Sequence, residues 1–208
     1  MTADTLRRSP LGHLAAVFAE HSTPAEHSIA GERGARLREV PFLAQLDVQL
    51  EPHGPAARRI ASALGAPLPT EPNSVAEAGD LRVLWLGPEE WLVTGPDGSA
   101  AATAVLLGAA LRDGPGSVVD VSANRTTLEL SGRCAREVLE KGCALDLHPR
   151  VFAPGACAQT LLAGVNVILH QVDAEPTYRL LVRGSFARYV SDWLLDAMEE
   201  YRHAPLTP

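Results

Sequence analysis

The chain has 208 residues, of which 46% are hydrophobic and 21% are charged, as in an ordinary globular protein. Its formal net charge of -7, without any lysine and arginine run, argues against a surface for nucleic acid or anionic membranes. Since no segment reaches the roughly 20 apolar residues of a membrane span and the three cysteines lack C-x-x-C spacing, we expect a cytoplasmic protein with reduced thiols and no metal site.

The first predicted element is a short amphipathic helix. Ser9-Pro10 resembles an N-cap followed by proline at the first helical position. The next apolar residues recur at the spacing of one helix face and are Leu11, Leu14, Ala15 and Phe18. Residues 22–35 are polar and predict a loop or arm. We therefore expect residues 1–35 to be a docking segment whose apolar face, with Leu6, packs on another subunit.

Residues 36–116 are predicted to form a first β/α subdomain. Apolar and polar side chains alternate from Phe42 to Leu50, which indicates a half-buried strand. A helix follows from Gly54-Pro55 to Leu64, and three prolines make residues 66–80 a loop. Two hairpin strands and an alanine-rich and leucine-rich helix complete the subdomain, at 82–86, 91–94 and 99–111.

Residues 117–208 are predicted to form a second β/α subdomain of the same kind. Its expected strands are 118–121, 126–130, 158–162, 165–171 and 178–182, with helices at 134–141 and 185–201. In each subdomain a strand, a turn of four to eight residues and a strand that begins with an aromatic residue precede an apolar helix. We therefore predict an α+β fold of two related ferredoxin-like units, with antiparallel sheets and helices on one face.

Motifs for common catalytic and cofactor sites are missing from the sequence. It contains no dinucleotide fingerprint, P-loop, nucleophile elbow or H-E-x-x-H helix, and its seven histidines lack ligand spacing. We interpret Trp85, Trp91 and Trp193 as core or interface anchors. Cys143 follows a helix C-terminus, which disfavours a thiolate, so we expect a packing role.

A block in the second half carries a family resemblance. It comprises residues 120–132 (DVSANRTTLELSG), 135–149 (AREVLEKGCALDLHP), 152–155 (FAPG) and 159–162 (QTLL), and it is supported by segments at 6–11, 38–43, 85–92 and 178–182. Over most of its length the chain resembles the gamma subunit of heterotetrameric sarcosine oxidase. The resemblance implies a complex with alpha, beta and delta subunits, of which alpha is the expected direct contact.

The same resemblance implies where the chemistry lies. The complex oxidises sarcosine to glycine with oxygen, forms hydrogen peroxide, and passes the one-carbon unit to tetrahydrofolate. FAD, FMN, NAD and zinc are then expected in the partner subunits, with none bound by this chain. The resemblance therefore implies a structural subunit without catalytic residues.

The block also resembles, more remotely, the folate-binding T-protein of the glycine cleavage system. That resemblance places an acidic folate-contacting position at Asp146, although Gln159-Thr160 lacks the usual aromatic residue between them. The chain supplies at most half of such a folate cleft, so we expect Asp146 to close a turn and not to be catalytic. Two alternatives remain open: a stand-alone folate-binding one-carbon transfer protein, and an unrelated α+β binding module.

Overall fold

The computed structural model describes residues 7–22, 34–112 and 114–201. These residues divide into two compact units. Unit 1 holds the described residues up to Pro41, Thr126–Pro154 and those from Thr160 onward, and unit 2 holds Phe42–Arg125 and Gly155–Gln159. Among the described residues, no helix combines the length and apolar character needed to span a membrane.

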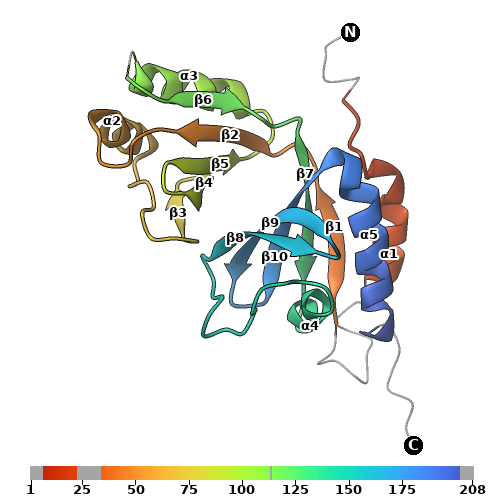
Figure 1. Cartoon of the computed structure of the whole chain (residues 1–208). Coiled ribbons are helices and arrows are strands. Elements are labelled where there is room, and N and C mark those ends of the chain that lie inside the picture. The colour runs from red at the N-terminus through yellow and green to blue at the C-terminus, as the bar shows by residue number, and fades with distance from the viewer. Residues whose placement is uncertain (1–6, 23–33, 113, 202–208) are drawn as a thin grey trace, which may run out of the picture. The chain divides into compact units, whose positions relative to one another are not determined.

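Unit 2 is built on a five-stranded sheet with the order β3-β4-β5-β2-β6. Its elements follow the chain as β2 (Ala44–Gln49), α2 (Pro55–Leu64), β3 (Val75–Ala78), β4 (Leu81–Gly87), β5 (Glu90–Gly95), α3 (Ala100–Leu111) and β6 (Ser117–Asp120) (Figure 1). Without β3, this is the β-α-β-β-α-β succession of a ferredoxin-like fold. β3 extends the sheet beside β4.

The core of unit 2 lies between one face of this sheet and the two helices. Alternate residues of β2, β4 and β5 join Ile60 of α2 and Leu107 of α3 in one buried cluster. The Arg59 side chain ties the helices together, because its Nε donates to the carbonyl of Ala110 (2.7 Å) and its Nη2 to that of Leu111 (2.9 Å). These carbonyls end α3 and lack helical partners, so the arginine satisfies them and complements the helix dipole.

Unit 1 contains the second five-stranded sheet, with the order β1-β7-β10-β9-β8. The strands are β1 (Arg36–Val40), β7 (Arg125–Ser131), β8 (Cys157–Leu162), β9 (Val165–Asp173) and β10 (Thr177–Arg183), of which β7 and β8 begin within unit 2. The helices are η2 (Gly12–Leu14), α1 (Ala15–His21), α4 (Ala135–Glu140), α5 (Gly184–Met198) and η3 (Glu199–Tyr201). α5 packs against β10, α1 and α4 (Figure 1).

The two sheets are permuted copies of one arrangement. Reading β6-β2-β5-β4-β3 beside β1-β7-β10-β9-β8 pairs each strand with a counterpart in the other sheet. Only the strand next to β2 or β7 differs in its origin: β6 follows α3 in the chain, whereas β1 comes from near the N-terminus. The predicted α+β fold of two related antiparallel units is therefore confirmed.

The strand exchange explains why the units differ from the subdomains predicted at 36–116 and 117–208. β1 lies before residue 42 but pairs with β7, and β6 lies after residue 116 but pairs with β2. A strand joins the sheet that contains its hydrogen-bonding partners. Dividing the chain into contiguous segments cannot predict those partners.

The N-terminal helix belongs to the core of unit 1. Leu11, Leu14 and Phe18 are each less than 7% exposed, and α1 packs against β1 and α5. The Ser9 hydroxyl accepts a hydrogen bond from the Leu11 backbone N–H (3.1 Å), which gives this start a capping contact. The prediction that this apolar face packs on another subunit is therefore wrong for these residues, while Leu6 and residues 23–33 lie outside the described part of the chain.

Candidate functional site

Asp146 lies in the exposed segment between α4 and β8. Its Oδ1 accepts a hydrogen bond from the His148 backbone N–H at 2.9 Å, and the Arg150 backbone N–H donates to His148 Nδ1 at 3.2 Å. Both bonds span two residues, as in turns closed by side chains. The carboxylate is thus exposed to solvent and closes a local turn.

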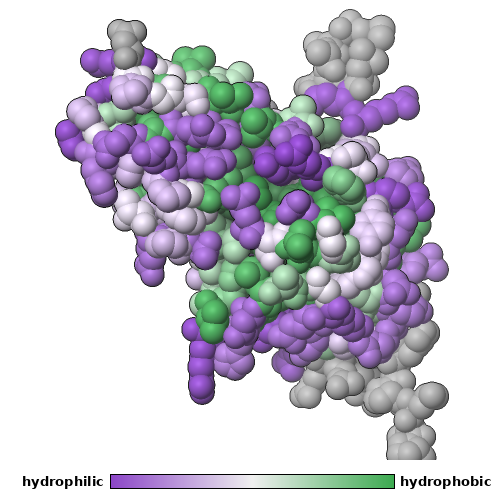
Figure 2. All heavy atoms as spheres, viewed as in Figure 1, coloured by the Kyte–Doolittle hydropathy of each residue, from purple (hydrophilic) through white to green (hydrophobic). Residues whose placement is uncertain are grey.

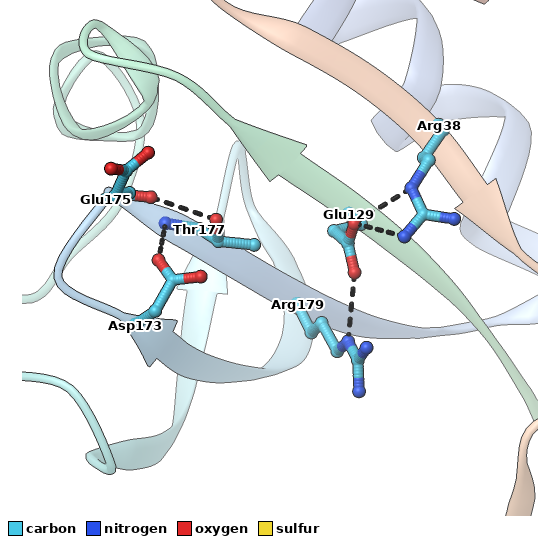
Figure 3. A network of polar contacts seen from close by, with 6 residues as sticks. All are labelled: Arg38, Glu129, Asp173, Glu175, Thr177 and Arg179. Atoms are coloured by element: carbon cyan, nitrogen blue, oxygen red, sulfur yellow. Dashed lines mark hydrogen bonds and ion pairs between the residues drawn. The ribbon is translucent and has the colours of Figure 1, made fainter. Parts of the chain in front are cut away.

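The most elaborate polar arrangement in unit 1 centres on Glu129 of β7. Its side chain is only 10% exposed and lies between arginines from both neighbouring strands (Figure 3). Arg38 of β1 donates through Nε to Oε1 at 2.8 Å and pairs with the same oxygen through Nη2. Arg179 of β10 donates through Nε to Oε2 at 3.1 Å.

This arrangement has the geometry of a structural clamp. Both carboxylate oxygens accept bonds from cations, so the buried charge is compensated and its lone pairs are engaged. A proton-accepting role would require one of these ion pairs to open. Glu129 therefore joins β1, β7 and β10 across the sheet. The nearby Asp173, Glu175 and Thr177 form a separate hydrogen-bonded turn at the β9–β10 hairpin.

Unit 2 contains a pair of carboxylates that sequence inspection did not single out. Glu90 is opposite Gln49 in the β2–β5 register, and Asp47 is two residues before Gln49 on the same face. Burial, then the negative charge of Asp47, raises the pKa of Glu90, whereas Arg125 lowers it. Asp47 Oδ1 is buried without a hydrogen-bond partner. The signal that could have found the pair is their diagonal position, which depends on knowing the strand register.

The tryptophans and cysteines serve mainly in packing. Trp91 is fully buried and donates its indole N–H to the Pro69 carbonyl at 2.8 Å. Trp193 lies against Gly142, where a Cβ would approach its ring to 2.5 Å, so only glycine fits there without a shift. Cys134, Cys143 and Cys157 are not joined in disulfide bonds, and burial raises the pKa of Cys157 to about 12. Cys143 itself is half-buried.

Within the described ranges, no group of three or more histidine, cysteine, aspartate or glutamate side chains could hold a metal ion. The polar groups described so far are the exposed turn carboxylate of Asp146, the Glu129 clamp and the Asp47–Glu90 pair, in which the pKa of Glu90 is raised. Two of the three, the clamp and the pair, arise from strand register, and both are built into the sheets of their units.

Comparison with known proteins identifies the family. Residues 51–200 match the model of the sarcosine oxidase, gamma subunit family. The chain is 40% identical to the sarcosine oxidase subunit gamma of Corynebacterium sp. (strain P-1), over 97% of this chain and 95% of that protein. It is 42% identical to the subunit gamma of an Arthrobacter species, over 95% and 92% respectively.

Solved structures agree with this match. A chain of heterotetrameric sarcosine oxidase from Corynebacterium sp. U-96 superposes with a TM-score of 0.88 and 38% identity, over 97% of this chain and all of that one. Aminomethyltransferase T of the glycine cleavage system from Bartonella henselae shares the fold, with a TM-score of 0.60 and 16% identity over 93% of this chain and 54% of that one. The chain belongs to the sarcosine oxidase gamma subunit family.

Proposed function

We propose that this chain is the structural gamma subunit of a heterotetrameric sarcosine oxidase. The observation that carries the proposal is the match over 97% of this chain and 100% of a chain from a solved heterotetramer of that enzyme. The oxidation of sarcosine to glycine, with oxygen as acceptor and hydrogen peroxide as product, is then a property of the whole assembly. Alpha, beta and delta subunits are the proposed partners, with alpha in direct contact.

The proposed role is non-catalytic because the folate-candidate carboxylate Asp146 and the clamped Glu129 lack the setting that acid–base chemistry requires. Asp146 is exposed and engaged in a turn, and both oxygens of Glu129 are engaged by arginines. A general acid or base must reach the reacting group, and these two carboxylates are instead engaged by their own turn and by neighbouring strands. FAD, FMN, NAD and zinc are therefore proposed to reside in the partner subunits, and tetrahydrofolate to act as a substrate of the complex.

Changing Asp146→Asn in the assembled complex tests the non-catalytic role. Methylene-tetrahydrofolate formation should stay within a few-fold of the unchanged complex, because the carboxylate is solvated and contacts only its own turn. A loss of roughly a hundredfold with assembly intact, the scale of removing a general acid or base, would contradict the proposal. Glu137→Gln, a carboxylate change in α4 of the same unit, is the matched control.

The alternative of a stand-alone one-carbon transfer protein makes a different prediction for the isolated chain. Aminomethyltransferase T shares the fold of this chain, but the likeness covers only 54% of that protein. Equilibrium binding of tetrahydrofolate to the isolated chain separates the two functions. A structural subunit should show no saturable binding, whereas micromolar binding that Asp146→Asn abolishes would favour the alternative.

A further inference from the structure

Helix α3 is unusual because it contains no charged residue. Its sequence, AAATAVLLGAAL, spans Ala100–Leu111, in a chain with 21% charged residues. One side carries Thr103, Leu107 and Leu111 into the core of unit 2. A helix that is hydrophobic on every side is normally enclosed on every side, so the outer side of α3 calls for an explanation.

The outer side of α3 is exposed in the chain by itself. Val105 is 74% exposed and Leu106 is 44% exposed. Smaller residues complete this side, namely Ala101, Ala102, Gly108 and Ala109, all of them exposed. Figure 2 shows hydrophobic residues over α3, along the upper edge of the view. We call these six residues the α3 face.

The neighbouring helix α2 shows that this composition is not general to the unit. α2 packs beside α3 and buries Ala56, Ile60 and Leu64, but its outer side carries polar residues such as Arg58 and Ser62. Both helices bury residues in the same core cluster. Only α3 continues the apolar character outward, so packing within unit 2 does not account for it.

The chemistry of the α3 face defines what it can bind. Without charges it offers no ion pair, so a partner surface must itself be apolar and uncharged to avoid burying an unpaired charge. Because alanine and glycine are small, they allow the partner backbone to approach closely, whereas the exposed side chains of Val105 and Leu106 can serve as anchors. Exposed apolar patches of this kind mark protein–protein interfaces.

We propose that the α3 face is where another subunit of the heterotetramer docks, through an uncharged apolar surface. This inference rests on the proposed function, and it commits to a different subunit because a relative that this chain covers completely was solved within a heterotetrameric enzyme. The apolar N-terminal helix is not available for this role, since its face is buried in unit 1.

Glutamate substitutions in the α3 face test the proposal in the full complex. The gamma chain is affinity-tagged and co-expressed with the other three subunits, and the amount of each subunit retained per gamma chain is measured. Val105→Glu places a charge at the centre of the face. Gly108→Glu does so where an added Cβ meets open space and a better helix former replaces glycine, so the fold is retained. Ser62→Glu adds the same charge to the outer side of α2 as the matched control.

Val105→Glu and Gly108→Glu should each lower retention of the partner subunits at least tenfold, while Ser62→Glu retains them and Gly108→Glu melts no lower than the unchanged chain. Full retention by a folded Gly108→Glu variant would overturn the proposal. So would conversion of a gamma dimer to a monomer with the other subunits still bound, because the face would then bind a second copy. Failure of the unchanged chain to retain any partner would instead refute the proposed function itself.

Discussion

At the scale of single residues, strand register decides which polar groups meet. Glu129 is central because β1 and β10 both flank β7 and bring an arginine to each side of it. Asp47 and Glu90 are diagonal neighbours on β2 and β5. In the first case opposite charges meet around the buried Glu129, and in the second like charges meet at the half-buried Asp47 and Glu90. The two clusters therefore predict opposite responses when a carboxylate is neutralised.

Glu129→Gln should lower the free energy of unfolding by about 1–3 kcal/mol, because it leaves two arginines without their carboxylate in a partly buried setting. Denaturant unfolding measures the change. Asp192→Asn is the control, since it removes an exposed Arg188–Asp192 pair one helical turn apart, and such pairs contribute about 0.5 kcal/mol or less. Equal losses in both variants would contradict the assignment of Glu129 as a clamp.

Glu90→Gln should stabilise the protein at neutral pH and have little effect in acid. Burial and Asp47 raise the pKa of Glu90 in the folded chain, so the folded state holds the proton to higher pH than the unfolded state does. The stability contributed by protonated Glu90 is present below the unfolded pKa and is lost as pH rises through the folded pKa.

Melting temperatures at pH 4 and pH 7 test whether Glu90→Gln stabilises the protein at neutral pH. The variant should melt higher than the unchanged chain at pH 7. The difference should shrink at pH 4, because protonation of Glu90 makes its side chain uncharged like that of the glutamine variant. Glu89→Gln, the adjacent exposed carboxylate at the β4–β5 turn, is the control. A lower melting temperature for Glu90→Gln at pH 7 would show that Arg125 dominates the environment of Glu90.

At the scale of elements, the sequence predicts best where a periodic pattern is long. The strands at 82–86 and 91–94 and the helices at 99–111 and 185–201 correspond to β4, β5, α3 and α5 within a few residues. Two short strands were missed. β1 buries only Leu37 strongly and is otherwise largely charged, and β3 lies in the segment predicted as a loop. Both are maintained by partner strands, which a local pattern does not reveal.

A prediction about stability concerns the N-terminal helix α1. Phe18→Ala should lower the free energy of unfolding by about 3–5 kcal/mol, the usual cost of truncating a buried phenylalanine. Phe18 is 3% exposed within unit 1. Glu20→Ala, which changes an exposed residue of the same helix, should have little effect. Unchanged stability in Phe18→Ala, with loss of subunit assembly, would restore the expectation that this helix is a docking element.

At the scale of the whole molecule, the fold followed from the sequence more readily than its organisation did. The similar succession of strands and helices in the two halves predicted two similar antiparallel units. The matching strand orders of the two sheets confirm this prediction. The exchange of β1 and β6 between the halves was not predictable, because the local sequence of a strand does not indicate which distant strand it pairs with. The hydrogen bond of Asp146 spans only two residues, whereas the Glu129 clamp depends on the pairing of β1 with β7, which the local sequence does not specify.

As a member of the sarcosine oxidase gamma subunit family, this chain is expected to assemble into a larger enzyme. Native mass spectrometry of the chain co-expressed with alpha, beta and delta subunits tests this expectation most directly. We predict a heterotetramer that contains the chain, with flavin in the assembly and none on the isolated chain. A flavin-loaded complex of the other three subunits that excludes this chain, or stoichiometric flavin on the chain purified alone, would contradict the account.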